Sequence, residues 1–154
     1  MMTGTFKDQP WAQRFKKLGD EAEQIFESWA AIQGIGFHRS GLDRPPFQVG
    51  KLPTLIAYTP DYLTADCYIE VQGFGRAQEI KLKEDKLQAL WSWDRMHCTK
   101  LFLWDNANRR TALLPIKWFL LNKPTREGAY PEGKPYTCWD ANQVDTWEPY
   151  GLAE

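Results

Sequence analysis

The chain lacks several features that would assign it quickly to a class of protein. Its three cysteines, Cys67, Cys98 and Cys138, are odd in number and widely spaced. They make neither a disulfide framework nor a zinc motif, and they favour a reducing compartment such as the cytoplasm. No apolar run approaches membrane-spanning length, so no membrane partner is expected. The first 30 residues carry charges throughout, so we do not expect them to be a signal peptide.

Charge and phosphate-loop patterns are also missing. The formal net charge is −1, so no global basic field points to nucleic acid, although local basic patches remain possible. No glycine-rich phosphate loop is present, and the two histidines lie outside any nucleophile motif. What the chain has instead is a heavy aromatic load, with eight Trp, eight Phe and six Tyr in 154 residues. Hydrophobic residues at 43% and charged residues at 25% are typical of one globular domain.

Apolar spacing predicts the order of the elements. Apolar residues recur every three or four positions over residues 11–32, which predicts one amphipathic helix ended by Gly34 and Gly36. Residues 84–96 predict a second helix. Strands are expected at residues 37–40, 52–58, 67–72, 79–83, 100–104 and 110–116. The strand at 79–83 would extend a hairpin, and Pro115 places the last strand at an edge.

These elements predict an α/β (α+β) fold with a central mixed sheet flanked by helices. We expect residues 1–121 to form the core domain. Residues 122–154 are rich in Pro, Gly, Tyr and Trp without clear periodicity, which predicts an ordered but irregular extension packed on the same domain.

Two acidic residues stand out in residues 59–73. Asp61 follows a proline at the end of one apolar run, and Glu70 lies in the middle of the next. Side chains alternate along a strand, so Glu70 and Gln72 share one face, opposite Ile69 and Val71. A carboxylate inside a strand is costly to bury without a partner, and a divalent cation between Asp61 and Glu70 would be one. A half-exposed strand with a polar outer face explains the pattern at least as well.

The pattern Pro60-Asp61, then Glu70-Val-Gln72-Gly73, then a basic helix, resembles the PD-(D/E)XK nuclease superfamily. The resemblance covers residues 18–104 and implies a restriction-endonuclease-like αβββαβ core. It also implies that Asp61, Glu70 and the carbonyl of Val71 bind Mg²⁺ or Mn²⁺. Such a metal lowers the pKa of a bound water and neutralises charge on the scissile phosphate.

Gln72 departs from the lysine of the usual pattern. Glutamine can hydrogen-bond the attacking water but supplies no charge. Lys86 or Lys83 would then reach the phosphate, with Lys86 in the first turn of the second helix; a solvated lysine face is the competing interpretation. The first helix often donates another acid in this superfamily, which implies a catalytic role for Glu23, although a surface position explains it equally well.

The resemblance implies a metal-dependent DNA endonuclease of structure-specific or repair and recombination type. A phage or mobile-element origin would be natural for so compact an enzyme. Expected DNA contacts are Lys81, Lys83, Lys86, Arg76 and Arg44. Alternatives are a catalytically inactive nuclease-fold module that binds nucleic acid or protein, and an aromatic-rich structural or assembly protein. A homodimer is expected as well, with an interface in residues 122–154 anchored by Tyr136, Trp139 and Trp147. The alternative is that this segment folds back over its own sheet and covers the core of one subunit.

Overall fold

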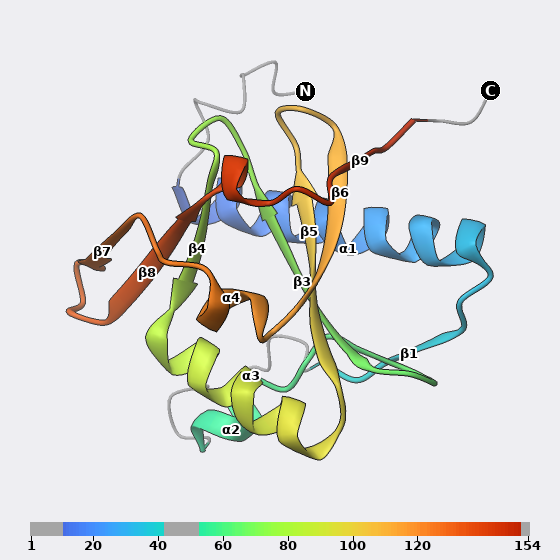
Figure 1. Ribbon diagram of the computed structural model, residues 1–154, viewed down its shortest axis with the longest axis horizontal. Helices are drawn as coiled ribbons and strands as arrows, with labels where there is room; N and C mark the ends of the chain where they lie inside the picture. Colours follow the sequence, from blue (N-terminus) through green and yellow to red (C-terminus); the bar gives the residue numbers. More distant parts are fainter. Residues whose placement is uncertain (1–10, 42–52, 152–154) are drawn as a thin grey trace.

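The computed structural model describes the backbone of residues 11–41 and 53–151, and the side chains from residue 18 onward within those ranges. Its elements follow one another along the chain as shown in Figure 1. They are α1 (Trp11–Gln33), β1 (Phe37–Arg39), α2 (Thr54–Ala57), β2 (Tyr62–Thr64), β3 (Tyr68–Phe74), β4 (Glu79–Lys83), α3 (Glu84–Met96), β5 (Thr99–Asp105), β6 (Arg110–Pro115), α4 (Trp118–Leu121), β7 (Arg126–Ala129), β8 (Pro135–Asp140), the 3-10 helix η3 (Ala141–Gln143) and β9 (Glu148–Pro149).

The larger sheet has six strands in the order β1-β2-β3-β5-β6-β9. β3 and β5 run parallel over their whole length, and the other neighbours are antiparallel. This confirms the predicted central mixed sheet. β9 pairs only with Arg110 and Thr111, so the Pro115 end of β6 lies at an edge, as its proline indicated.

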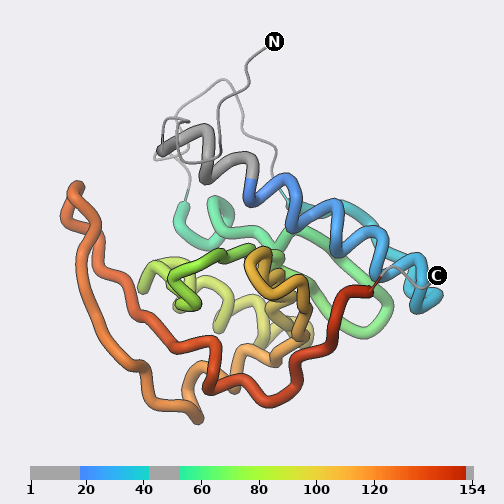
Figure 2. The backbone as a smooth tube through the Cα atoms, turned by 90° about the horizontal axis from the view of Figure 1, so that it is seen from above, coloured from blue at the N-terminus to red at the C-terminus, as the bar shows by residue number. Residues whose placement is uncertain are grey.

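β4, β8 and β7 form a separate three-stranded sheet in that order. The expectation that β4 extends a hairpin with β3 was therefore wrong, because β4 pairs with β8 instead. The prediction that residues 122–154 are irregular was also wrong in part, since β7 and β8 pair over residues 126–138. Figure 2 shows the β7–β8 hairpin on the opposite side of the molecule from α1. The hairpin is stabilised by pairing with β4, a contact that residues 122–154 alone do not reveal.

α1 covers one face of the larger sheet with the predicted apolar stripe. Ala22, Phe26 and Ala30, one turn apart, are fully buried in a cluster with residues of β3 and β5. α1 ends at Gln33, and Gly34 follows with a φ of 71°, a conformation that suits glycine. Near its other end, α1 approaches β3 closely, because a Cβ on Gly73 would lie 3.1 Å from the Leu18 side chain.

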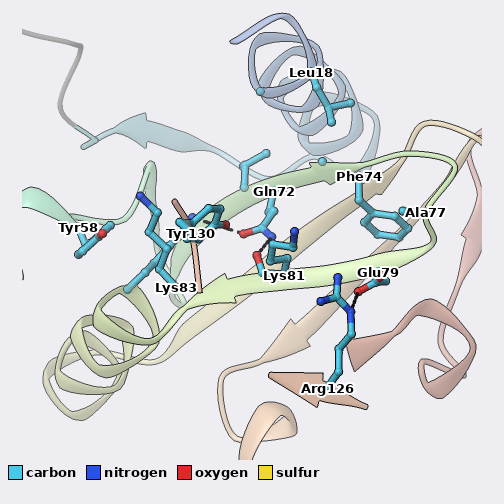
Figure 3. Close-up of a pocket in the computed structure, with 14 residues that line it drawn as sticks. Leu18, Tyr58, Gln72, Phe74, Ala77, Glu79, Lys81, Lys83, Arg126 and Tyr130 are labelled. Carbon is cyan, nitrogen blue, oxygen red and sulfur yellow. Dashed lines mark hydrogen bonds and ion pairs between the residues drawn. The ribbon is translucent and has the colours of Figure 1, made fainter. Parts of the chain in front are cut away.

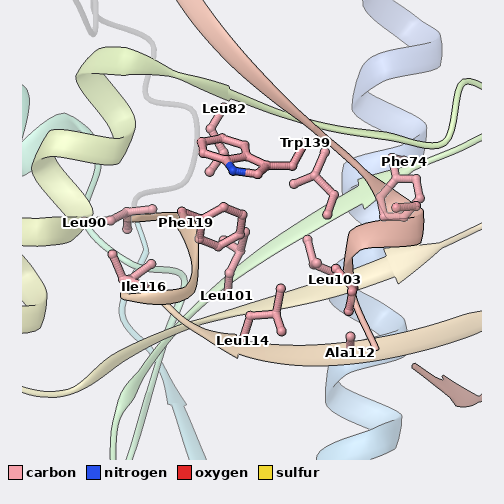
Figure 4. Packing of buried hydrophobic residues seen from close by; sticks show 13 residues of the cluster. Phe74, Leu82, Leu90, Leu101, Leu103, Ala112, Leu114, Ile116, Phe119 and Trp139 are labelled. Carbon is pink, nitrogen blue, oxygen red and sulfur yellow. The ribbon is translucent and has the colours of Figure 1, made fainter. Parts of the chain in front are cut away.

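The opposite face of the larger sheet carries the second hydrophobic cluster. Leu101 and Leu103 of β5 point into this cluster, while Phe102 and Trp104 point toward α1. Figure 4 shows how the cluster closes between α3, α4 and the smaller sheet. Its members from those elements include Leu90, Phe119, Ile80, Leu82 and Trp139. The larger sheet is therefore covered on both faces, by α1 on one side and by α3, α4 and the smaller sheet on the other.

The strand predicted at residues 52–58 is wrong. Thr54–Ala57 form the short helix α2, preceded by Pro53. A short apolar run does not distinguish a strand from a helix by its periodicity. Here α2 packs on α3, and the indole nitrogen of Trp93 donates a hydrogen bond to the Leu55 carbonyl at 3.0 Å.

The three aromatic residues expected to anchor a dimer all have contacts within the chain. Trp139 is 1% exposed in the core. Trp147 packs against Phe74 with ring centroids 5.7 Å apart, and its indole nitrogen donates to the Ala141 carbonyl. Tyr136 belongs to β8 and meets Tyr130 edge to face at 4.9 Å. Trp139 is therefore a core residue, whereas Tyr136 and Trp147 are half-buried. This packing fits the alternative that the segment covers the core of its own subunit, and the homodimer stays a prediction.

Candidate active site

The antiparallel register of β2 and β3 brings the two predicted acids together. Tyr62 lies opposite Ile69, so one further step places Asp61 opposite Glu70. The ladder stops there, and the backbone N–H of Val71 instead donates to the Asp61 carboxylate at 2.8 Å. Cys67, Ile69 and Val71 are buried in the α1 cluster, which confirms the alternation predicted for β3. Glu70 and Gln72 therefore point to the opposite face.

The backbone of Asp61 is held by the segment that follows β1. The N–H groups of Ser40 and Gly41 donate to the Asp61 carbonyl at 2.9 and 3.0 Å. The Ser40 hydroxyl donates to the Pro60 carbonyl at 2.9 Å. A Cβ on Gly41 would lie 2.9 Å from the Asp61 Cα, so this close crossing requires glycine. The result is a fixed position for the first acid.

The two acids repel each other in a largely buried site. Glu70 is 8% exposed. Burial, followed by the charge of Glu70, raises the pKa of Asp61 to about 8, although the Val71 N–H and Lys86 act to lower it. The Asp61–Glu70 pair therefore holds on to a proton more strongly than two separate carboxyls would. The site is short of positive charge, which is the condition that a bound cation would relieve.

Lys86 is the cation that the fold supplies to the acid pair. It lies in the first turn of α3, and its Nζ is 2.8 Å from the Glu70 carboxylate and 3.4 Å from the Gln72 side-chain carbonyl oxygen. Burial alone would lower the pKa of Lys86, but the charges of Glu70 and Asp61 outweigh burial and raise it. The structure thus places the Lys86 ammonium beside both Glu70 and Gln72.

Gln72 has a backbone partner that the sequence did not reveal. Its side-chain nitrogen donates to the Lys81 carbonyl at 2.7 Å, while its oxygen accepts from Lys86. This amide links β3 to β4, two strands that belong to different sheets. Gln72 is thus placed to hold Lys86 in position.

Glu23 lies at the rim of the site. Its carboxylate forms an ion pair with Arg39 at 2.9 Å. Burial raises the pKa of Glu23, the Arg39 hydrogen bond lowers it, and the charge of Asp61 raises it further, with a net upward shift. The neighbouring Glu27 accepts a hydrogen bond from the Tyr62 hydroxyl at 2.6 Å. The charge of Asp61 therefore affects the pKa of Glu23, but the ion-pair partner of Glu23 is Arg39.

The donor set fits a metal with few protein ligands. Among the described residues, no three His, Cys, Asp or Glu side chains are grouped so that they could hold an ion. Mg²⁺ commonly binds through one or two carboxylates and keeps several waters or substrate phosphates. The facing carboxyls of Asp61 and Glu70, which a bound cation would allow to ionise together, match that requirement. The carbonyl of Val71 remains the predicted third ligand.

A cavity of about 480 Å³ opens beside the acid pair and is lined in part by Val71, Gln72 and Lys86. Lys81, Lys83 and Arg126 also line it, with Glu79 as its acid (Figure 3). Of the other predicted DNA contacts, Arg76 is exposed in the turn before β4, and Arg44 lies outside the described residues. Arg126 and Tyr130 also line the cavity and were missed, because only the pairing of β7 and β8 with β4 places them there.

No protein-family model matches the chain, and no curated protein matches its sequence. Solved structures do match, among them Hjc, a Holliday junction resolvase from the archaeal hyperthermophile Archaeoglobus fulgidus. The two are 15% identical, the match covers 80% of this chain and 89% of that chain, and the TM-score is 0.49. In the described part of this chain, no helix is long and apolar enough to span a membrane.

Proposed function

We propose that this protein is a metal-dependent endonuclease that hydrolyses phosphodiester bonds in DNA. The observation that supports it best is the facing pair Asp61 and Glu70, with Lys86 at 2.8 Å from Glu70 and a basic cavity alongside. Carboxylates that bind Mg²⁺, together with a lysine, are the side chains that phosphodiester hydrolysis uses. This proposal places the protein in the PD-(D/E)XK superfamily, with Gln72 as a departure from its motif.

The roles follow from the contacts of each side chain. When bound, Mg²⁺ or Mn²⁺ would lower the pKa of a water and offset charge on the phosphate. Asp61 and Glu70 would hold the ion, and the Val71 N–H orients the Asp61 carboxylate for this. Lys86 would stabilise the negative charge that develops on the phosphate, and Gln72 keeps the Lys86 ammonium beside β3.

The direct test is cleavage of supercoiled plasmid and of branched DNA, with Mg²⁺, with Mn²⁺ and with chelator. We expect cleavage only with metal, and none in Asp61→Asn or Glu70→Gln. Asp145→Asn removes an exposed acid outside the site and serves as the matched control. Full activity of either site variant would refute the assignment, and circular dichroism would check that each variant is folded.

A charge exchange tests whether Lys86 replaces the motif lysine. Gln72→Lys alone would crowd two ammonium groups and remove the oxygen that accepts from Lys86. Lys86→Gln alone would leave Glu70 without its cation. We expect both single variants to lose turnover, and the double variant Gln72→Lys/Lys86→Gln to recover part of it. A double variant as inactive as Lys86→Gln would contradict this role.

A catalytically inactive binding module is the second candidate. This candidate is favoured by the ion pair between Lys86 and Glu70, because Lys86 already occupies one of the two carboxylates that would bind the metal. Calorimetry with Mn²⁺ separates the two, because a nuclease must bind the ion at Asp61 and Glu70, and an inactive copy should not. A structural protein would instead show no DNA affinity that falls with salt.

We also propose a homodimer in a reducing compartment. A single metal site hydrolyses one strand in each binding event, so cleavage of both strands of a duplex or junction requires two sites. Light scattering tests this directly, since a mass of 17.9 kDa with and without DNA would show a monomer.

A further inference from the structure

The cavity lies along an edge of β3 that no strand of the described residues covers. β2 pairs only with Tyr68 and Ile69, whereas β3 continues to Phe74. β4 follows β3 after a short turn but pairs in the smaller sheet, so β3 and β4 diverge. The cavity fills this fork, with Leu18 of α1 on one side and residues of β4 and β7 on the other (Figure 3).

The wall formed by the smaller sheet alternates cations with aromatic rings. The Lys81 ammonium lies 4.4 Å from the Tyr136 ring centroid, and that of Lys83 lies 5.1 Å from the Tyr130 centroid. Gly128 permits this arrangement, because a Cβ there would lie 2.5 Å from the Tyr136 hydroxyl oxygen. Tyr130, just beyond β7, is the ring of this pair that lines the cavity.

Arg126 has two hydrogen-bond partners at the far end of the same wall. Its Nε donates to Glu79 at 2.8 Å, and its Nη1 donates to the Tyr136 hydroxyl at 3.1 Å. Glu79 already neutralises Arg126, and the Lys83 ammonium lies 4.0 Å from the Glu132 carboxylate, so the positive charge available to a ligand comes mainly from Lys81, with a smaller share from Lys83. Lys86 stands between this wall and Glu70, which connects the cavity to the acid pair.

We propose that this cavity binds one unpaired nucleotide of a DNA strand, with its base stacked on Tyr130 and its phosphates beside Lys81 and Lys83. This inference rests on the proposed nuclease function and names its substrate class, which is DNA with unpaired nucleotides near the cut. A base in a duplex already has neighbours on both faces, so it can stack on a protein ring only when it leaves the helix.

The size and composition of the cavity favour a nucleotide over a duplex. About 480 Å³ falls in the range of sites for small ligands, and the lining combines apolar and aromatic groups with a few cations. Alternating cations and rings bind single strands, because every base has a face that can stack. A strand whose base lies at Tyr130 would pass Lys81, Lys83 and Lys86 on its way to the acids.

The test is equilibrium binding by fluorescence anisotropy, in chelator so that no cleavage occurs. The three labelled DNAs are a single strand, the fully paired duplex of the same sequence, and that duplex with a single-stranded overhang. We expect the single strand and the overhang to bind more tightly than the paired duplex. Unlabelled thymidine monophosphate is added as a competitor, because a site for free nucleotides would let it compete as strongly as the strand does.

Substitutions at Tyr130 test how much its ring contributes to DNA binding. Tyr130→Ala should weaken binding of the single strand about 5- to 150-fold, while binding of the paired duplex changes less than about twofold. Tyr130→Phe keeps the ring and should bind nearly as the natural protein does. Tyr150→Ala removes a half-buried tyrosine outside the cavity and should change neither affinity. Lys81→Ala should reduce the salt dependence of single-strand binding by about 0.7 in slope.

The outcomes separate this inference from the proposed function. An equal effect of Tyr130→Ala on all three DNAs, or no effect, overturns the nucleotide site, and strong competition by the monophosphate overturns it as a strand site. Metal-dependent cleavage in the same preparation would leave the nuclease proposal standing. If no DNA binds with an affinity that falls with salt, both proposals fall together.

Discussion

Replacing Asp61 with asparagine should stabilise the metal-free protein at alkaline pH. Burial and Glu70 raise the pKa of Asp61 from 3.8 to about 8. The folded protein therefore keeps a proton that the unfolded chain releases, so the stability that this proton brings is fully present below about pH 4. It is lost progressively as the pH rises to about 8. The amide of the Asp61→Asn variant does not titrate, so this variant should lose less stability over the same range.

The magnitude follows from the size of the pKa shift. The rise from 3.8 to about 8 is about four units, and at 1.36 kcal/mol per unit it sets a ceiling of about 6 kcal/mol. Water entry and the nearby Lys86 reduce this, so we expect a gain of about 1–3 kcal/mol at pH 8.5. That corresponds to a rise in Tm of about 3–10 °C. Below about pH 4 the Asp61 carboxyl is neutral in both the folded and the unfolded chain, so the stabilities of the two proteins should nearly coincide there.

Thermal unfolding in chelator, followed by circular dichroism between about pH 4 and pH 8.5, measures this directly. Asp145→Asn, which changes an exposed acid, is the control and should keep the natural pH profile. Adding Mg²⁺ should raise the Tm of the natural protein more than that of Asp61→Asn. If the stability of Asp61→Asn depends on pH as that of the natural protein does, or if the variant is less stable than the natural protein at pH 8.5, then burial and Glu70 do not destabilise the ionised form of Asp61 and the reasoning fails.

Three further predictions concern the same site. Metal binding at pH 7 should release close to one proton, because Asp61 must give up its proton to bind the ion. Calorimetry in buffers of different ionisation enthalpy measures the number of protons released, and zero release would contradict the raised pKa of Asp61. The Lys86→Met variant should bind Mn²⁺ at least as tightly as the natural protein, because a cation that competes for Glu70 is gone. It should nevertheless cleave DNA about 10²- to 10³-fold more slowly. Retained cleavage would show that Lys86 is only structural. Gly41→Ala should cost about 1–3 kcal/mol of stability, since its Cβ meets Asp61, whereas Gly75→Ala meets nothing within 4 Å and serves as its control in denaturant unfolding.

Local patterns predicted the individual elements well. The helix α3 spans the predicted residues 84–96, and the alternation along β3 correctly separated Glu70 from the buried Val71. α1 follows its apolar stripe and ends before Gly34. These features depend on the 3.6-residue and two-residue periods of the backbone, which neighbouring residues along the chain specify.

Contacts between distant residues decided the rest. An apolar run at residues 52–58 fits a strand or a helix equally, and packing on α3 selected the helix α2. The register of β2 and β3 brought Asp61 to Glu70, but only the docking of α3 brought Lys86 to Glu70 and Gln72. Similarly, Arg126 and Tyr130 reach the cavity because β7 and β8 join β4. The sequence by itself determined the elements and the pair of acids. The tertiary structure decided which cations and rings surround that pair, because strand pairing across long loops depends on side-chain packing that no local period encodes.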